Sequence, residues 1–243
     1  MDKSLIMFVR SKIMAYYIVL PLGCIMSLIF CISRAKDFSI RNLMLKSVSS
    51  LCYLLTAVFA VISNPKATVY GSLIIFGGAL GLVGDILLDL KGIYRKDEAS
   101  FLKGGFIFFL VGHLFYSSAT IYSLRLKWWI VLLCAAGALV FGYLIIASAK
   151  IMKVHYGAYR TIVFIYTSVL ALSMLLAIAS AIYTKFLAGY TVLAVGLILF
   201  TLSDAILSGT FFGRGKEKPF YFFTNHLTYY AGQYLIAASI MLM

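Results

Sequence analysis

The chain has 243 residues, of which 63% are apolar or aromatic and only 12% are charged, whereas a soluble domain is about half apolar and a quarter charged. A soluble domain of this length could not bury so many apolar side chains, and 19 glycines and 3 prolines beside 16% aromatic residues exclude a fibrous or disordered chain. The composition therefore predicts an all-α, polytopic integral membrane protein.

Eight apolar runs are long enough to cross a bilayer, which takes about 20 residues per helix. The first run follows three basic residues, as a signal peptide does, but it has no small-residue cleavage site, so we expect it to remain as a first span. No linker separates domains, and the sequence predicts a single bundle of eight transmembrane helices over residues 1–243. The runs lie at about residues 13–32, 43–62, 68–90, 104–123, 127–147, 160–182, 187–211 and 220–241.

The 21 Lys and Arg residues outnumber the 8 Asp and Glu residues. Nearly every base flanks an apolar run, so this charge reflects membrane topology and indicates no nucleic-acid partner. Loops 1/2, 3/4, 5/6 and 7/8 hold thirteen bases, against seven in the other loops and the tails. The positive-inside rule places those four loops in the cytoplasm and both termini outside, although the basic segment before the first span argues the other way. We expect the plasma membrane of a bacterium.

Small residues within the runs indicate packing. The four cysteines all lie in apolar runs without a C-x-x-C pair, so neither a disulfide framework nor a zinc site is predicted. Gly77 and Gly81 in the third run form G-x-x-x-G, which is typical of close helix packing, and they lack the spacing and the preceding strand of a phosphate loop.

Three acids, Asp85, Asp89 and Asp204, lie inside the runs. An ionisable group in hydrocarbon costs a few kcal/mol or more, so we expect each to face a cavity and to have a partner. Asp89 lies one turn after Asp85, near the helix end, where it could equally reach the interface and serve no site. Asp85 and Asp204 are therefore the stronger candidates.

Other polar side chains accompany these acids at similar depth. Since Lys46 follows loop 1/2, and Asp85 and Asp204 precede loops 3/4 and 7/8, all three are expected at the base-rich side, with His113 deeper as a floor. His113 alone could equally be a core histidine, and many of the 17 tyrosines must simply pack. The accompanying set is Lys46, His113 and Tyr116, and the row Asn225, Tyr229 and Gln233 on one face of the last helix.

A short internal repeat is also visible. Asp85-Ile-Leu-Leu followed by His113-Leu-Phe-Tyr116 is echoed by Asp204-Ala-Ile-Leu followed by His226-Leu-Thr-Tyr229. The two segments are four helices apart, so a duplication would be parallel, with its axis along the membrane normal.

At these residues the sequence resembles the YhhN-like membrane proteins, which include the lysoplasmalogenases. The resemblance covers the second to the eighth run in consistent order, and neither Asp89 nor His226 belongs to the pattern. The matching pieces are Lys46 with Ser47, Val83-Gly84-Asp85, Gly112-His113-Leu114-Phe115-Tyr116, Tyr166, Ser203-Asp204, and Thr228-Tyr229-Tyr230 with Gln233.

The resemblance implies hydrolysis of the vinyl-ether bond of a lysoplasmalogen, a single-chain ether lysophospholipid taken from the membrane. The products are a fatty aldehyde and glycerophosphoethanolamine or glycerophosphocholine, and Asp85 and Asp204 are the implied catalytic pair. Such a bond is cleaved by protonation at carbon and capture of the resulting cation by water, which requires one acid and one anion. Burial favours a neutral carboxyl and a nearby cation favours an ionised one, so two aspartates can divide these roles. Lys46 is a candidate for the substrate phosphate, and His113 and Tyr116 are candidates for hydrogen-bonding the aspartates or for positioning water.

Two other functions remain open at this point. His113, His155 and His226 with the aspartates could serve a metal-dependent lipid hydrolase, but no H-x-x-x-H spacing occurs, and neither a metal nor another cofactor is expected. Membrane aspartates and histidines are also typical of proton-coupled transporters. Against transport, the polar set lies toward one side of the membrane.

Overall fold

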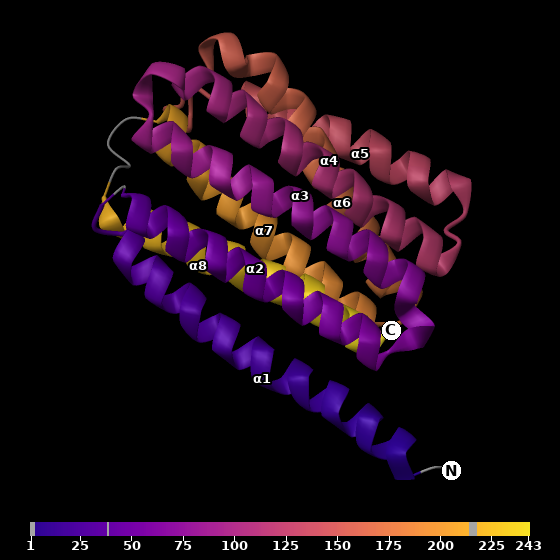
Figure 1. The fold of residues 1–243 in the computed structure, drawn as a ribbon. Helices are drawn as coiled ribbons and strands as arrows, with labels where there is room; N and C mark the ends of the chain where they lie inside the picture. The colour runs from indigo at the N-terminus through magenta and orange to yellow at the C-terminus, as the bar shows by residue number, and fades with distance from the viewer. Residues whose placement is uncertain (1–2, 38, 214–217) are drawn as a thin grey trace.

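The computed structural model describes residues 3–37, 39–213 and 218–243, and eight α-helices account for most of them. They are α1 (Lys3–Arg34), α2 (Ile40–Ser63), α3 (Thr68–Ile93), α4 (Glu98–Leu124), α5 (Trp128–Ala147), α6 (Arg160–Tyr183), α7 (Ala188–Phe212) and α8 (Pro219–Ser239). Four short 3-10 helices accompany them: η1 (Pro65–Ala67), η2 (Arg95–Asp97), η3 (Gly157–Tyr159) and η4 (Ile240–Leu242). The predicted all-helical, multi-pass architecture is confirmed (Figure 1).

Seven of the helices in the described part of the chain are long and apolar enough to cross a membrane, namely α1 to α7. The exposed faces carry large apolar side chains, such as Leu133 and Leu144 on α5, as expected of a surface in contact with lipid. The helix α8 has a buried face rich in polar groups, including Asn225, His226 and Gln233. The count of eight spans therefore stays a prediction.

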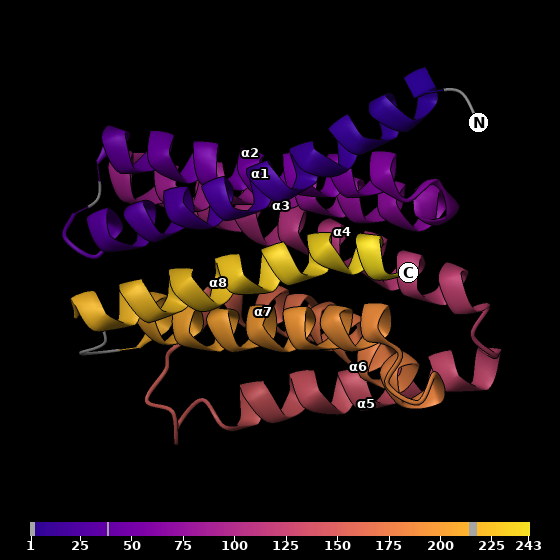
Figure 2. The same cartoon turned by 90° about the horizontal axis from the view of Figure 1, so that it is seen from below.

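The connections between helices are short and are made by residues suited to turns. Ser39 accepts a hydrogen bond from the backbone N–H of Asn42, 3.3 Å away, and so caps the start of α2. Pro65 begins η1, where its missing N–H is harmless. Arg125 adopts a left-handed conformation, φ 46°, and reverses the chain between α4 and α5. Adjacent helices are therefore antiparallel, and the start of α1 and the end of α8 lie at the same end of the bundle (Figure 2).

The bundle consists of two similar halves of four helices. In Figure 2 the first four helices lie on one side and the last four on the other. In the first half α2 packs on α3 and α3 on α4, and in the second half α6 packs on α7 and α7 on α8. Between the halves, α4 packs on α6 and α8 packs on α2, while α8 also packs on α1. The first two contacts are reciprocal, as expected of a parallel duplication.

Glycines fix the register of this repeat. A Cβ atom on Gly77 would lie 2.8 Å from the carbonyl oxygen of Gly112, and one on Gly196 would lie 3.0 Å from that of Gly232. Each half thus contains a pair of helices whose backbones touch. Asp85 follows Gly77 by eight residues, as Asp204 follows Gly196. Because Gly112 corresponds to Gly232, Gln233 is the counterpart of His113. The expected alignment of His113 with His226 is wrong by two helical turns.

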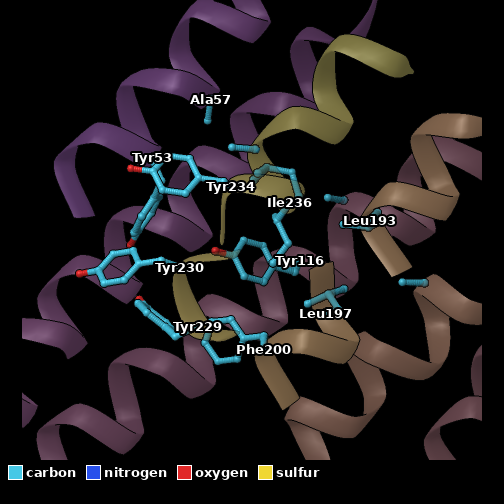
Figure 3. Close-up of a cluster of buried hydrophobic side chains, with 14 of the residues drawn as sticks. Tyr53, Ala57, Tyr116, Leu193, Leu197, Phe200, Tyr229, Tyr230, Tyr234 and Ile236 are labelled. Atoms are coloured by element: carbon cyan, nitrogen blue, oxygen red, sulfur yellow. The ribbon is translucent and has the colours of Figure 1, made fainter. Parts of the chain in front are cut away.

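The core between the halves is aromatic. Figure 3 shows tyrosines of α2, α4 and α8 beside residues of α7 such as Phe200. The rings of Tyr229 and Tyr230 have centroids 5.0 Å apart, and those of Phe200 and Tyr229 5.2 Å. Tyrosine suits this position because its ring packs while its hydroxyl can reach a buried polar partner.

Candidate active site

A pocket opens at the end of the bundle opposite the end of α8, where α2, α6 and α8 begin and α3, α5 and α7 end. One wall is polar and includes Lys46, Asp85 and Asp204, while the opposite wall is apolar and includes Phe141 and Leu170. The cavity between these two walls has a volume of about 100 Å³. Candidate residues from five helices, α2, α3, α6, α7 and α8, are thus brought to one cavity.

Asp85 on α3 is 2% exposed, and both of its carboxylate oxygens have polar partners. The Nζ atom of Lys46 lies 3.3 Å from Oδ1. The hydroxyls of Ser50 and Tyr229 each donate to Oδ2 at 2.7 Å. One cation and two hydroxyl donors together satisfy an ionised carboxylate.

Asp89, one turn further along α3, extends this charged cluster and does not reach the interface. Its side chain is 6% exposed, and its Oδ1 atom lies 3.4 Å from Lys46 Nζ and 3.7 Å from Arg34 Nε. Two carboxylates and two cations therefore lie in a buried row at the polar wall. Lys46 lies between Asp85 and Asp89 and lines the pocket, and its predicted role at a substrate phosphate stays a prediction.

Asp204 on α7 has different surroundings, although it lines the same pocket. It is half-buried, and Tyr166 of α6 donates its hydroxyl hydrogen bond to Oδ2. Ser203 bonds chiefly to the carbonyl oxygen of Phe200, at 2.7 Å, and lies 3.5 Å from Oδ1 of Asp204. The bonds of Asp204 are thus to hydroxyl groups, whereas Asp85 also faces an ammonium group.

A chain of hydrogen bonds leads from Asp85 into the core. Tyr229, which donates to Asp85, accepts from Gln233 Nε2 at 3.1 Å, and Gln233 Oε1 accepts from Tyr116 at 3.0 Å. Tyr230 donates to the carbonyl oxygen of Lys46 at 3.1 Å. Tyr116 is therefore linked to Asp85 only through Gln233 and Tyr229. A direct hydrogen bond from Tyr116 to an aspartate, which the sequence suggested, is not formed within the part of the chain that the structure describes.

The histidines make their bonds away from the aspartates. His113 Nδ1 lies 2.8 Å from Ser173 Oγ, and its ring lies 4.5 Å, between centroids, from that of Phe200. The expected bond from His113 to an aspartate is therefore absent between these described residues. His226 packs against Phe30 and bonds to the carbonyl oxygen of Phe222. Among residues 3–37, 39–213 and 218–243, no group of three or more His, Cys, Asp or Glu side chains is placed to hold a metal ion.

Three residues that belong to the charged cluster or bond to it are absent from the sequence-based candidate set or were set aside there. Ser50 follows Lys46 by one turn on the same face of α2, and this spacing could have revealed it. Asp89 stands in the same relation to Asp85. Arg34 ends α1, where a base is ordinarily explained by topology alone.

These features define a multi-pass helical membrane protein with an acidic, amphipathic pocket inside its bundle. Residues 42–240 match the YhhN family, and the chain belongs to that family, in agreement with the resemblance seen in its motifs. A search of curated proteins and a search of solved structures found no match. Of the charged residues at the polar wall, Arg34 lies outside the matched segment.

Proposed function

We propose that this protein hydrolyses the vinyl-ether bond of lysoplasmalogens and releases a fatty aldehyde and a glycerophosphodiester. The observation that carries the proposal is the pair of aspartates in one amphipathic pocket, one bonded to a lysine and the other to a tyrosine. Membership of the YhhN family supports the same reaction class. The apolar wall suits the alkenyl chain and the polar wall suits the headgroup.

The contrast between the surroundings of the two carboxyls supports a different role for each in the proposed reaction. Asp204, bonded to hydroxyl groups, is the acid that protonates the vinyl carbon distal to the ether oxygen, and an oxocarbenium ion forms. Asp85, ionised beside Lys46, stabilises this cation and accepts a proton from the attacking water. The resulting hemiacetal then breaks its C–O bond: the Asp204 carboxylate takes back a proton from the hemiacetal hydroxyl as the aldehyde forms, and Asp85 gives its proton to the departing glycerol oxygen. The net reaction consumes one water, and both carboxyls return to their starting protonation states.

The test is aldehyde release by detergent-purified protein from an alkenyl lysophospholipid, with the acyl ester analogue as the comparison substrate. Asp85→Asn and Asp204→Asn are each expected to lower turnover about 10²- to 10⁴-fold, because each removes a proton-transferring or charge-stabilising group. Asp97→Asn, at an exposed carboxyl before α4, is the matched control and should keep full activity.

Thermal unfolding and gel filtration establish that each variant is folded. Near-normal turnover in either folded pocket variant would make that aspartate structural and the two-carboxylate mechanism wrong. Activity should persist in EDTA, and a loss restored by one divalent ion would favour a metal-dependent hydrolase. Lipid or proton flux into liposomes without aldehyde release would favour transport.

A further inference from the structure

Arg34 occupies a buried position at the mouth of the pocket. It is the last residue of α1, its side chain is 4% exposed, and it lines the cavity together with Lys46 and Asp89. Its guanidinium group lies over the ring of Phe222, 5.3 Å from the centroid. This aromatic contact and the ion pair with Asp89 fix the planar group in one orientation.

Arg34 and Lys46 converge on one point. Both approach the same oxygen, Asp89 Oδ1, Arg34 with Nε at 3.7 Å and Lys46 with Nζ at 3.4 Å. Two cations from different helices are thereby directed to one side of the cavity, and Asp89 keeps them close together against their mutual repulsion. A guanidinium fork next to an ammonium group is the arrangement that binds a phosphate oxygen pair.

The charges of this cluster also restrict the ligand. Arg34 and Lys46 balance Asp85 and Asp89, so the polar wall is neutral when these four groups are ionised and Asp204 is the protonated acid of the proposed mechanism. A phosphate at the two cations brings one negative charge, which a cationic amine on the same headgroup offsets beside the carboxylates. The chemistry of the wall therefore favours a phosphodiester with an attached amine over a headgroup without phosphate.

We propose that Arg34, with Lys46, binds the phosphate of the lysolipid headgroup and so determines headgroup selectivity, with Asp89 positioning both cations. The proposal rests on the proposed function for the identity of the lipid. The phosphate chemistry itself could also be supplied by a free glycerophosphodiester, which is the product of the reaction.

The test measures equilibrium binding to detergent-solubilised protein with a ligand that cannot be cleaved. The probes are 1-O-alkyl-lysophosphoethanolamine, 1-O-alkylglycerol and free glycerophosphoethanolamine. The wild-type protein is expected to bind the lysophospholipid about 10- to 100-fold more tightly than the alkylglycerol, the effect of one or two charge-assisted hydrogen bonds. Free glycerophosphoethanolamine should compete at concentrations at least about 100-fold higher, because it lacks the chain.

The decisive variant is Arg34→Gln, which keeps a hydrogen-bond donor near Asp89 and removes the charge. Its preference for the lysophospholipid should fall to within about 3-fold, with alkylglycerol binding unchanged, and Arg34→Lys should retain an intermediate preference. Arg41→Met, which removes an exposed cation from the start of α2, should bind like the wild type. If Arg34→Gln does not fold, an unchanged preference in Arg34→Lys overturns the proposal.

Equal weakening of both lipid probes in Arg34→Gln would show a structural role for Arg34 and overturn the proposal. Equal competition by glycerophosphoethanolamine and the lysophospholipid would show that the phosphate-binding site at Arg34 and Lys46 takes a soluble phosphodiester, and would overturn the lipid assignment. Because no probe contains a vinyl ether, the result does not depend on turnover. If the protein prefers the lysophospholipid over the alkylglycerol, this preference depends on Arg34, and no aldehyde is released, then the phosphate-binding site is supported while the proposed function fails.

Discussion

Lys46 is a buried cation with two carboxylate partners, and its charge matters to the folded state. Its Nζ atom lies within 3.4 Å of both Asp85 and Asp89. Breaking a buried ion pair by removing one partner costs about 3–5 kcal/mol, because an uncompensated charge is left behind. We therefore expect the lysine to contribute to the stability of the folded state, in addition to its proposed role beside Asp85.

Lys46→Met is expected to lower the free energy of unfolding by about 3–5 kcal/mol. The double variant Lys46→Met/Asp89→Asn should recover most of that loss, since Arg34 and Asp85 then remain as a balanced pair. Aldehyde release should stay low in both, because Asp85 has lost its ammonium partner. Thermal unfolding in detergent measures the stabilities, and Asp89→Asn alone completes the cycle. Additive losses in the double variant would show that the two residues are not coupled.

The sequence is informative about which side chains meet and less so about their bonds. Depth along each run is enough to bring Asp85, Asp204 and Tyr229 to one end, because span boundaries follow hydropathy. The rotation of a helix about its own axis does not follow from hydropathy when nearly every residue is apolar. His113 was accordingly expected to face an aspartate, but it faces Ser173 of α6.

At the scale of helices, the closest contacts are the backbone crossings of α3 with α4 and of α7 with α8. A Cβ on Gly112 would lie 2.9 Å from the carbonyl oxygen of Gly77, and one on Gly232 would lie 2.7 Å from that of Gly196. Backbone oxygens cannot move aside as a side chain can. The glycines therefore set how closely the aspartate-bearing helices approach their partners.

Gly112→Ala and Gly232→Ala are each expected to lower the melting temperature and to impair aldehyde release, although alanine is the better helix former. The control is Gly137→Ala on α5, where the added methyl group would meet the end of the Leu175 side chain at 3.3 Å. That variant should be neutral or slightly stabilising. Circular dichroism melts in detergent compare the three, and a stable, active Gly232→Ala would show that the α7–α8 crossing can widen without cost.

These crossings also show the limits of short sequence matches. G-x-x-x-G at Gly77 and Gly81 predicted close packing, and Gly77 is indeed a point of contact. Gly196 and Gly232 belong to no such motif, so the second crossing has no equally plain signal. Without it, the repeat was aligned on two histidines that occupy different places.

For the whole molecule, the orientation in the membrane decides which side of the membrane the pocket faces. The pocket opens at the end formed by loops 1/2, 3/4, 5/6 and 7/8, which hold most of the basic residues. The positive-inside rule therefore predicts a cytoplasmic mouth.

Single cysteines in a background without native cysteines test this orientation. Ser100→Cys, at the start of α4, should resist an impermeant thiol reagent applied to intact cells, and Lys66→Cys, in η1, should react. Both positions are exposed, and permeabilised cells supply the control for reactivity. Labelling of Ser100→Cys with protection of Lys66→Cys would place the pocket mouth on the outer face.

Asp85 and Asp204 occupy equivalent positions in the two halves of the bundle, but the residues that bond to them differ. Lys46 is the seventh residue of α2 and Tyr166 the seventh of α6, and each bonds to the aspartate of its own half. In a fully symmetrical ancestor, two identical carboxyls would hold a shared proton equally well and neither would be its fixed donor. A lysine inherited in one half and a tyrosine in the other remove that degeneracy. In the proposed mechanism, the division of labour between the aspartates thus originates in their partners, and a duplicated site gains direction by losing its symmetry.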